Sequence, residues 1–514
     1  MTQSLQSLLD DGARLLRERR IDAANRLAAD LLARFPEAAA VRYFASDAAL
    51  AQGNPAAALQ CIEALPPAGA TAPLSLLRRA KILVQLRRRT EALEIARSVA
   101  ARVVRDLWQL GTLASVLREC QDLEAAHYWL TRTHEWFPTQ VIALFDLAVV
   151  EFQLNRIDEA EIHLETLLRM DPRHAGALRL RSLLRTWDPE KNHVAQLEAL
   201  LASADGGRLE ASAGYALAKE CEDIGDHDRA FAALQIGARA QRALMDYDSA
   251  SECAALDHVR EAFPSAAVMD AVSGFTEASP IFVVGLPRTG TTLVERILGS
   301  HSQVRAVGEI TDFPDILSDA IAALPEAAGS SAKALDFRDI GQRYADSAAQ
   351  LAGGAARFVD KLPYNFLYCG YILAALPNAR IVHLVRDPMD TCYAVYKTLF
   401  VGAYAWSYDL DEIADYYLAY RRLMQHWHEV LGNRILDVSY EELVRDPATV
   451  TRNMLSFCDL PWEDAVLAFH EHPDAALTAS AVQVRRPVYT DSVGAWNRVG
   501  SHLSRLQERL ASAE

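Results

Sequence analysis

The feature that most constrains this chain is an apolar run that ends in a loop rich in glycine and threonine and continues into an amphipathic segment. Residues 281–284 are apolar and mostly β-branched, as in a strand buried on both faces, and Gly285 ends the run. Over 291–298, leucine and isoleucine recur on one face of a helix. We therefore expect backbone N–H groups between strand and helix to bind an anion at the positive end of the helix.

The loop resembles the phosphate-binding Walker A loop in its spacing but not in its cation. Gly285 and Gly290 are five residues apart, and Thr292 stands where that loop has serine or threonine. Thr291 occupies the position of the Walker lysine, and the cation of this loop is Arg288 instead. Nucleotide triphosphatases depend on that lysine and on Mg²⁺ held by the neighbouring hydroxyl, so the loop favours another phosphorylated ligand. A glycine-rich turn without a ligand is the alternative.

The first half of the chain reads as an array of helical repeats. An alanine returns at intervals of 33 to 35 residues, after a polar turn and in most units an acidic residue. These alanines are Ala23, Ala57, Ala92, Ala125, Ala160, Ala195 and Ala230. The pattern resembles the tetratricopeptide repeat, a helix–turn–helix unit of about 34 residues, in which alanine suits the close approach of neighbouring helices. Such arrays usually bind peptides or proteins, and we expect a protein or peptide partner here. A nonrepetitive helical bundle is the alternative.

The second half alternates helices with short apolar strands, which predicts a parallel sheet covered by helices. The expected strands lie at 281–284, 358–359, 381–385 and 435–438. Ligands gather beyond the carboxyl ends of the strands in such sheets. We expect a helical repeat domain over 1–263, a linker rich in Ser, Gly and Pro over 264–279, and the sheet domain over 280–514.

Two residues at predicted strand ends are candidates for binding a nucleotide. Arg386 directly follows the strand 381–385, and its fork of N–H donors suits a phosphate. Tyr440 follows the strand 435–438 and could offer its hydroxyl or its ring to a nucleotide. The alternatives are a helix-start arginine paired with Asp390 and a tyrosine that belongs to the core.

Three motifs together resemble the sulfotransferases that use 3′-phosphoadenosine 5′-phosphosulfate. They are Pro-Arg-Thr-Gly-Thr-Thr at 287–292, Arg-Asp-Pro-Met-Asp at 386–390 and Tyr-Glu-Glu-Leu-Val at 440–444. The resemblance is in particular to tyrosylprotein sulfotransferases and to bacterial proteins that join tetratricopeptide repeats to such a domain, and it covers about 280–500. It implies an N-terminal tetratricopeptide-type α-solenoid followed by a P-loop-like α/β domain with a parallel sheet.

The resemblance also implies how the donor is bound. It assigns the 5′-phosphosulfate to the loop residues Pro287, Arg288, Thr289, Gly290, Thr291 and Thr292. It assigns the 3′-phosphate to Arg386, and Arg485 and Arg486 lie in a segment that looks like the one closing over the nucleotide. The reaction would leave adenosine 3′,5′-bisphosphate.

One position departs from the family pattern. The family usually has a serine eight residues after the arginine that binds the 3′-phosphate, and this chain has Ala394 there. Thr391, Tyr393 or Lys397 could compensate at the 3′-phosphate site, which is the part of the assignment that this departure affects.

Sulfuryl transfer to a hydroxyl needs a base for the acceptor proton and positive charge for the sulfate and the leaving phosphate. Glu309 follows a short Val-Arg-Ala-Val segment as the catalytic glutamate does in the tyrosylprotein enzymes, with Asp312 in reserve. Lys361 and Arg288 are the candidate catalytic cations. The chain has six lysines and forty-six arginines, so a lysine here slightly favours a role that arginine would not fill. An ordinary loop carboxylate and a solvated lysine paired with Asp360 are the alternatives.

Composition bounds the remaining possibilities. The formal net charge of −16 argues against general binding to nucleic acid, and no apolar run approaches the roughly 18 residues of a membrane span. Seven cysteines without a CxxC pair fit a reducing compartment, so we expect a cytoplasmic protein, and we expect no metal. The function expected is a sulfotransferase whose acceptor is a peptide tyrosine, a sugar or a small phenol. A P-loop kinase or nucleotide hydrolase and an inactive nucleotide-binding scaffold are the alternatives.

Overall fold

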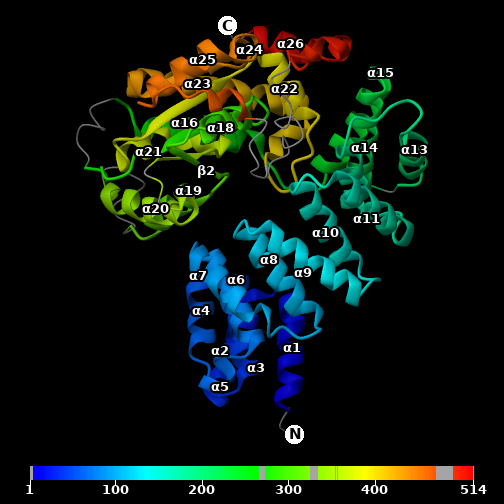
Figure 1. Cartoon of the computed structure of the whole chain (residues 1–514), viewed down its shortest axis with the longest axis vertical. Coiled ribbons are helices and arrows are strands. Elements are labelled where there is room, and N and C mark those ends of the chain that lie inside the picture. The colour runs from blue at the N-terminus through cyan, green and yellow to red at the C-terminus, as the bar shows by residue number, and fades with distance from the viewer. Residues whose placement is uncertain are drawn as a thin grey trace. The chain divides into compact units, whose positions relative to one another are not determined.

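The computed structural model describes residues 4–204, 206–265, 273–324, 334–353, 355, 357–469 and 490–512. The chain divides into two compact units, Met1–Leu154 and Asn155–Glu514. The first unit is helical throughout its described residues (Figure 1). Its helices are α1 Leu5–Arg17, α2 Ile21–Arg34, α3 Ala39–Ala51, α4 Pro55–Glu63, α5 Pro67–Ala70, α6 Pro73–Gln85, α7 Arg89–Ala100, α8 Leu107–Glu119, α9 Leu123–Trp136 and α10 Val141–Gln153.

A left-handed turn repeats along the helical region with the period of the sequence pattern. The residue two places after the end of the first helix of a pair has a positive φ, which lets the chain reverse into the second helix. These residues are Arg19, Gly53, Arg87, Gln121 and Asn155, each 34 residues after the last, and Gly225 further on. The helix–turn–helix repeat expected from the sequence is confirmed.

The buried alanines of the repeats follow the predicted period, with a shift of one residue in several units. Ala92, Ala160 and Ala230 are buried as expected. In three other repeats the buried alanine is the next residue along the chain, namely Ala24, Ala58 and Ala126. Ala195 is exposed, so the repeat that contains it departs from the pattern.

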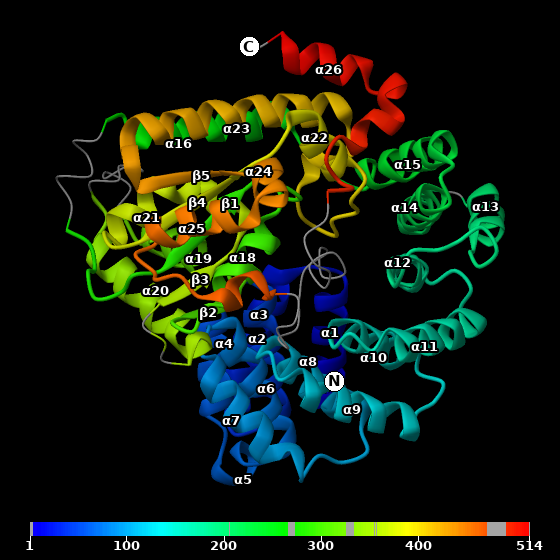
Figure 2. The ribbon, with the colours of Figure 1, turned by 45° about the horizontal axis from the view of Figure 1, so that its top comes forward.

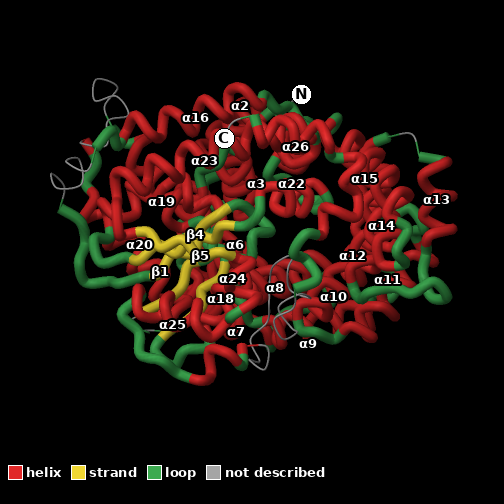
Figure 3. The backbone as a smooth tube through the Cα atoms, turned by 90° about the horizontal axis from the view of Figure 1, so that it is seen from above, coloured by secondary structure: helices red, strands yellow, loops and turns green. Residues whose placement is uncertain are grey.

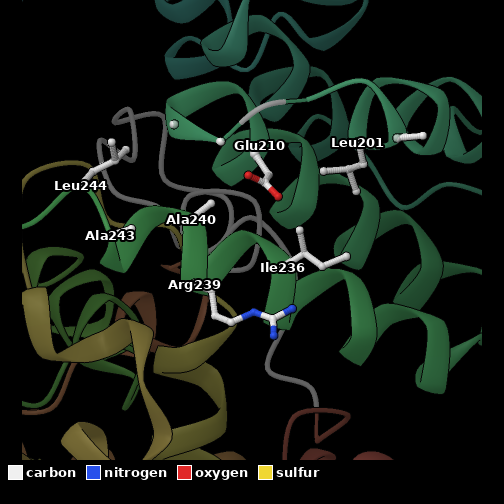
Figure 4. A pocket seen from close by; sticks show the side chains of 10 residues that line it. Leu201, Glu210, Ile236, Arg239, Ala240, Ala243 and Leu244 are labelled. Atoms are coloured by element: carbon white, nitrogen blue, oxygen red, sulfur yellow. The ribbon is translucent and has the colours of Figure 1, made fainter.

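The second unit begins with further helices of the same kind and continues into the sheet. Its first helices are α11 Ile157–Met170, α12 Ala175–Leu183, α13 Val194–Ala202, α14 Gly207–Asp223, α15 His227–Arg242 and α16 Ser249–Ala262. A hollow of about 520 Å³ is lined by residues of α13, α14 and α15 and the residues flanking them. Figure 4 shows Glu210 and Arg239 among its mostly apolar side chains.

Five parallel strands form the sheet, in the order β2-β3-β1-β4-β5. The strands are β1 Ile281–Gly285, β2 Val304–Gly308, β3 Arg357–Asp360, β4 Arg380–Val385 and β5 Ile435–Ser439. β2 was not among the strands expected from the sequence, where residues 304–307 form only a short Val-Arg-Ala-Val segment. Its exposed Arg305 interrupts the apolar pattern, because β2 lies at the edge of the sheet.

Helices cover both faces of the sheet (Figure 3). The remaining helices are α18 Thr291–Gly299, α19 Asp312–Ala322, α20 Phe337–Ala352, α21 Cys369–Ala375, α22 Pro388–Tyr396, α23 Leu410–Leu431, α24 Tyr440–Arg445, α25 Pro447–Phe457 and α26 Ser504–Ala511, with the 3₁₀ helices η3 Pro363–Tyr368, η4 Ala405–Tyr408, η5 Gly432–Arg434, η6 Asp464–Leu467 and η9 Ala495–His502. On one face, Ile281 and Val283 pack with side chains of α18 and α25. On the other, Phe282 stacks on Tyr344 of α20 with ring centroids 5.5 Å apart.

Within the second unit, repeat helices pack directly against the sheet region. Phe263, just after α16, lies against Trp427 of α23, and Figure 2 shows these two helices side by side. Tyr215 of α14 donates a hydrogen bond from its hydroxyl to the carbonyl oxygen of Tyr396, at 3.0 Å. Glu222 pairs with Lys397 at 2.7 Å. The predicted boundary at 264–279 stays a prediction, but the structure shows that α14 to α16 belong to the same compact unit as the sheet.

None of the helices in the described ranges is at once long enough and apolar enough to cross a membrane.

Candidate active site

Each strand of the sheet is followed directly, or within a few residues, by a residue that the sequence analysis singled out. Because the strands are parallel, their carboxyl ends meet at one edge of the sheet. The phosphate loop follows β1, Glu309 follows β2 and Lys361 follows β3. Arg386 follows β4, and Tyr440 follows β5. The fold therefore places the residues of all three sequence motifs at the edge where ligands bind in such sheets.

The phosphate loop owes its shape to three residues with positive φ. Gly285 has a φ of 147°, Gly290 of 106° and Arg288 of 70°. A positive φ strains any residue with a side chain, so its presence at Arg288 shows that the surrounding structure fixes the loop. Thr289 is buried and donates a hydrogen bond from Oγ1 to the carbonyl oxygen of Leu286 at 2.8 Å. Gly290 is the N-cap of α18 and has no side chain to cap the helix, so the first amide groups of α18 suit an anion.

Arg386 ties the end of β4 to the phosphate loop and to the C-terminal segment. Its Nη1 donates to the carbonyl oxygen of Arg288 at 2.9 Å, and its Nη2 donates to that of Ser492 at 2.5 Å. Its Nε is buried and has no hydrogen-bond partner among the described residues. A buried guanidinium N–H without a partner is costly, so Arg386 is poised to donate one more hydrogen bond to an acceptor.

Tyr440 directly follows β5 and packs beside Arg386 and the phosphate loop. We call the group formed by the loop, Arg386 and Tyr440 the phosphate-loop corner. Its ring lies 4.8 Å from the Arg386 guanidinium, and its hydroxyl lies 2.6 Å from Oγ of Ser492. The ring also packs on the loop, because a Cβ at Gly290 would lie 2.6 Å from it. Tyr440 is thus part of the phosphate-loop corner and not only of the core.

Asp390 does not pair with Arg386, which was the alternative considered from the sequence. Its carboxylate accepts hydrogen bonds from the backbone N–H groups of Gly494 at 2.6 Å and Trp496 at 3.2 Å. Asp390 therefore fixes the segment that begins η9 beside Arg386. The other predicted residues of the C-terminal segment, Arg485 and Arg486, lie outside the described residues.

The carboxylate and the lysine predicted to be catalytic meet at the other end of the site. Nζ of Lys361 contacts Oε1 of Glu309 and lies 3.8 Å from Oε2 of Glu295. The side chain of Lys361 is 1% exposed, whereas that of Glu309 is 40% exposed. Lys361 is thus a buried cation held by two carboxylates, and Glu309 is the one that faces solvent. The alternative of a solvated lysine paired with Asp360 is wrong, since Asp360 is buried and bonds to Tyr344 and Asn365.

Glu295 is the site residue that the sequence analysis missed. It lies on α18, and its burial raises its pKa above the usual range although Lys361 opposes this change. The signal in the sequence was a carboxylate within the apolar helix 291–298. Its partner could not be identified, because Lys361 lies 66 residues further along the chain.

Tyr404 lies beside this carboxylate–lysine pair with a strained backbone. Its φ is 52°, which is uncommon for a residue with a bulky side chain. Burial, and then the nearby charge of Glu309, raise the pKa of its hydroxyl. Its ring packs 4.7 Å from that of Tyr364 and 4.6 Å from that of Phe400. Tyr404 therefore belongs to an aromatic cluster and is the member of it that senses the charge of Glu309.

Of the three residues that could compensate for Ala394, Lys397 is already engaged in an ion pair. Lys397 pairs with Glu222, as described above. The hydroxyl of Thr391 donates to the carbonyl oxygen of Arg386, at 3.4 Å. The reserve base Asp312 is fully buried and accepts a hydrogen bond from Ser347, so it is not placed to meet an acceptor.

Comparison with known proteins agrees with this geometry. Residues 280–464 match the model of the sulfotransferase family, and residues 9–73 match a model of the tetratricopeptide repeat. Over residues 280–464 the sheet domain is thus similar to the sulfotransferase family. The motifs of the sulfotransferase domain at 287–292, 386–390 and 440–444 all lie within the matched range.

Relatives resemble different lengths of the chain. A protein of Aquifex aeolicus (strain VF5), itself uncharacterized, is 33% identical over 404 residues, which cover 76% of this chain and 52% of that protein. The protein-tyrosine sulfotransferase of Drosophila melanogaster is 28% identical over 244 residues, or 42% of this chain and 46% of that protein. The solved sulfotransferase domain from the Synechococcus PCC 7002 olefin synthase shares 20% identity at a TM-score of 0.32, covering 44% of this chain and 90% of that domain. The chain spans about half the length of the two curated relatives.

Proposed function

We propose that this chain transfers a sulfuryl group from 3′-phosphoadenosine 5′-phosphosulfate to an acceptor hydroxyl, and that its repeat region recruits the acceptor. The observation that carries the proposal is the meeting of three cations and one partly exposed carboxylate at the carboxyl ends of the strands. The cations are Arg288, Lys361 and Arg386, and the carboxylate is Glu309. Sulfuryl transfer needs positive charge around the sulfate and a base for the acceptor proton, and this edge of the sheet offers both.

The phosphate-loop corner fits the anionic ends of such a donor. The uncapped N-terminus of α18 suits the 5′-phosphosulfate, with Arg288 and the threonines around it. The unpartnered Nε of Arg386 suits the 3′-phosphate. Tyr440 would border the nucleotide, and we retain Arg485 and Arg486 as the cations that close over it. When bound, the donor supplies the activated sulfuryl group.

The carboxylate–lysine pair fits the chemical step. In this proposal Glu309 accepts the proton of the acceptor hydroxyl, since its carboxylate is the exposed member of the pair. Lys361 orients Glu309 and, with Arg288, places positive charge where charge develops on the sulfate and the leaving phosphate. Glu295 holds Lys361 from its buried side.

The acceptor that we propose is a tyrosine hydroxyl in a protein or peptide. The protein-tyrosine sulfotransferases among the relatives support this choice. The cluster of Tyr404, Tyr364 and Phe400 rings, of which Tyr404 senses the charge of Glu309, suits an aromatic acceptor. The tetratricopeptide repeats support recruitment of a protein, because such arrays usually bind peptides. A cytoplasmic location stays a prediction.

An inactive nucleotide-binding scaffold is the second candidate, and one observation favours it. Ala394 replaces the usual serine, and Lys397, which could have compensated, is paired with Glu222. A kinase or nucleotide hydrolase is less well supported, because Thr291 stands where the Walker lysine would be.

Radiolabelled donor and matched peptides can separate these functions. We expect label to pass to acidic peptides that contain tyrosine and not to the same peptides with phenylalanine instead. Calorimetry should show binding of adenosine 3′,5′-bisphosphate that is weakened by Arg288→Ala. Tight nucleotide binding without transfer to any tyrosine, sugar or phenol acceptor would support the scaffold. Mg²⁺-dependent turnover of ATP without binding of the bisphosphate would refute the proposal.

A further inference from the structure

Two histidines and an aspartate converge on the face of the sheet that α23 covers. His383 lies on β4 and is in register with Asp437 on β5, and His428 lies in the last turn of α23. The side chain of His383 is 5% exposed, that of His428 is 35% exposed and that of Asp437 is 48% exposed. The cluster is thus anchored in the protein on one side and open to solvent on the other.

The three side chains direct their ligand atoms at one small volume. Nδ1 of His383 lies 2.7 Å from Oδ1 of Asp437, and Nε2 of His428 lies 2.9 Å from the same oxygen. All three ligand atoms lie within 4.8 Å of one another. The contact of His428 with Asp437 is an ion pair, and among the residues that the structure describes no hydrogen-bond partner is found for its Nε2. That nitrogen therefore has a charged neighbour in Asp437 but not the hydrogen bond that a buried polar atom usually makes.

The surroundings of His383 are those of a metal ligand. Metal-binding histidines usually make a hydrogen bond through the ring nitrogen that does not bind the metal, and this bond fixes the tautomer and the ring orientation. Nε2 of His383 makes such a bond with the hydroxyl of Tyr420, which is buried. Nδ1 is thereby left to face Asp437 and His428.

We propose that His383, His428 and Asp437 bind a divalent transition metal ion, with Zn²⁺ as the best match. Two imidazole nitrogens and one carboxylate oxygen are ligands that Zn²⁺ accepts, with water in the fourth position. Bonds of about 2.0–2.1 Å in a tetrahedral arrangement would separate the ligand atoms by about 3.3 Å. The two contacts of Asp437 with the histidines, now 2.7 and 2.9 Å, would have to open by about half an ångström, which the partly exposed His428 and Asp437 can provide.

The position of the cluster suggests what the ion does. It joins β4, β5 and α23 on the side of the sheet opposite α18. β4 runs from His383 into Arg386 within three residues, and β5 runs from Asp437 into Tyr440 within three residues. An ion bound here would hold together the two strands that carry the proposed nucleotide-binding residues, so its role would be structural.

A hydrogen-bonded ion triad without metal is the competing explanation, and metal titration decides between the two. Full-length protein treated with a chelator and then dialysed is titrated with ZnCl₂ in a calorimeter. We expect one equivalent to bind at this site and to raise the melting temperature. His428→Ala should weaken this binding about tenfold or more, since even loss of an outer-shell partner costs 10- to 100-fold. His258→Ala, a change at an exposed histidine of α16, should leave it unchanged.

Cobalt and a second variant protect the test against misfolding. Co²⁺ bound in place of Zn²⁺ should give the visible absorption of a four-coordinate site in the parent protein, and this absorption should be lost in Asp437→Asn. Absence of stoichiometric Zn²⁺ binding would overturn the proposal and leave the cluster as an ion triad. Zn²⁺ binding that both folded variants retain at the parent affinity would also overturn it, because the ion would then bind elsewhere.

Discussion

Replacement of Lys361 by methionine would test whether this residue is the buried cation that balances Glu295. Methionine keeps most of the length of lysine and removes the charge. Nζ of Lys361 is held by Glu309 and Glu295, and its side chain is 1% exposed while that of Glu295 is 9% exposed. Removing one partner of a buried ion pair costs about 3–5 kcal/mol, because the other charge is left buried and uncompensated.

The expected change in melting temperature follows from the size of the unit. Unfolding entropy is about 2.1 cal/mol/K per residue, so the unit Asn155–Glu514, of about 360 residues, has a value near 0.76 kcal/mol/K. A loss of 3–5 kcal/mol should therefore lower the melting temperature by about 4–7 °C. Differential scanning fluorimetry of the full chain measures this shift, and radiolabelled donor measures the expected loss of transfer.

The pH dependence of stability gives an independent check with a definite sign. Burial raises the pKa of Glu295 in the folded protein, and loss of Lys361 removes the positive charge that opposes this rise. The folded variant then binds a proton that the unfolded chain releases, so its stability must fall as the pH rises. The slope should reach about 1.4 kcal/mol per pH unit between the pKa of an unfolded glutamate and the raised pKa.

Two further variants test whether the lost charge balance between Lys361 and Glu295 causes the expected loss of stability. Lys361→Met combined with Glu295→Gln removes both charges, so most of the lost stability should return while transfer stays absent. Lys191→Met, at a lysine that is 62% exposed and pairs with Glu161, should change stability by no more than about 0.5 kcal/mol. If the double variant is no more stable than Lys361→Met, charge balance is not what Lys361 provides.

Three other perturbations test the remaining assignments. Glu309→Gln should leave the affinity for adenosine 3′,5′-bisphosphate nearly unchanged and slow transfer by about 10²- to 10⁴-fold, the range for a lost general base; transfer at the parent rate would place the base elsewhere. Gly290→Ala should weaken bisphosphate binding in calorimetry about tenfold, because φ is 106° and the new Cβ would lie 2.6 Å from the Tyr440 ring. Gly225→Ala is its control, since φ is 82° there and no heavy atom lies within 4 Å of the new Cβ, and an equal effect of both changes would contradict the clash. Removal of residues 1–154 should preserve bisphosphate binding. Removal of residues 1–263 also takes away α14 to α16, so it should lower the melting temperature and impair bisphosphate binding. Equal binding by both fragments would show that α14 to α16 are dispensable.

The sequence predicted where the candidate residues lie when their position depends on local order along the chain. The loop at 287–292, Arg386 and Tyr440 each follow an apolar run, and parallel strands bring such positions to one edge whatever the connections between them. The same logic predicted Lys361, whereas Glu309 was predicted from the family resemblance, since β2 itself was not recognised as a strand. The predictions at strand ends needed only those ends and the direction of the sheet.

The parts that the sequence could not predict depend on contacts between distant residues. α16 has the amphipathic period of a repeat helix, so nothing local shows that Phe263 packs on Trp427 of the sheet region. The partner of Glu295 and the convergence of His383 with His428 and Asp437 are likewise set by tertiary packing. His383 alone reads as a histidine alternating within a strand, and its register with Asp437 appears only in the folded sheet.

Two contacts of α14 determine which fragment of the chain could be used in a fusion protein. Glu222 pairs with Lys397, and Tyr215 donates a hydrogen bond to Tyr396. Both contacts reach the end of α22, the helix that begins just after Arg386. A fusion protein designed from the motif boundaries alone would begin near residue 280. It would therefore lack α14 and both of these contacts. A transferable fragment that keeps both contacts must include α14, and the compact unit that contains α14 and the sheet starts at Asn155.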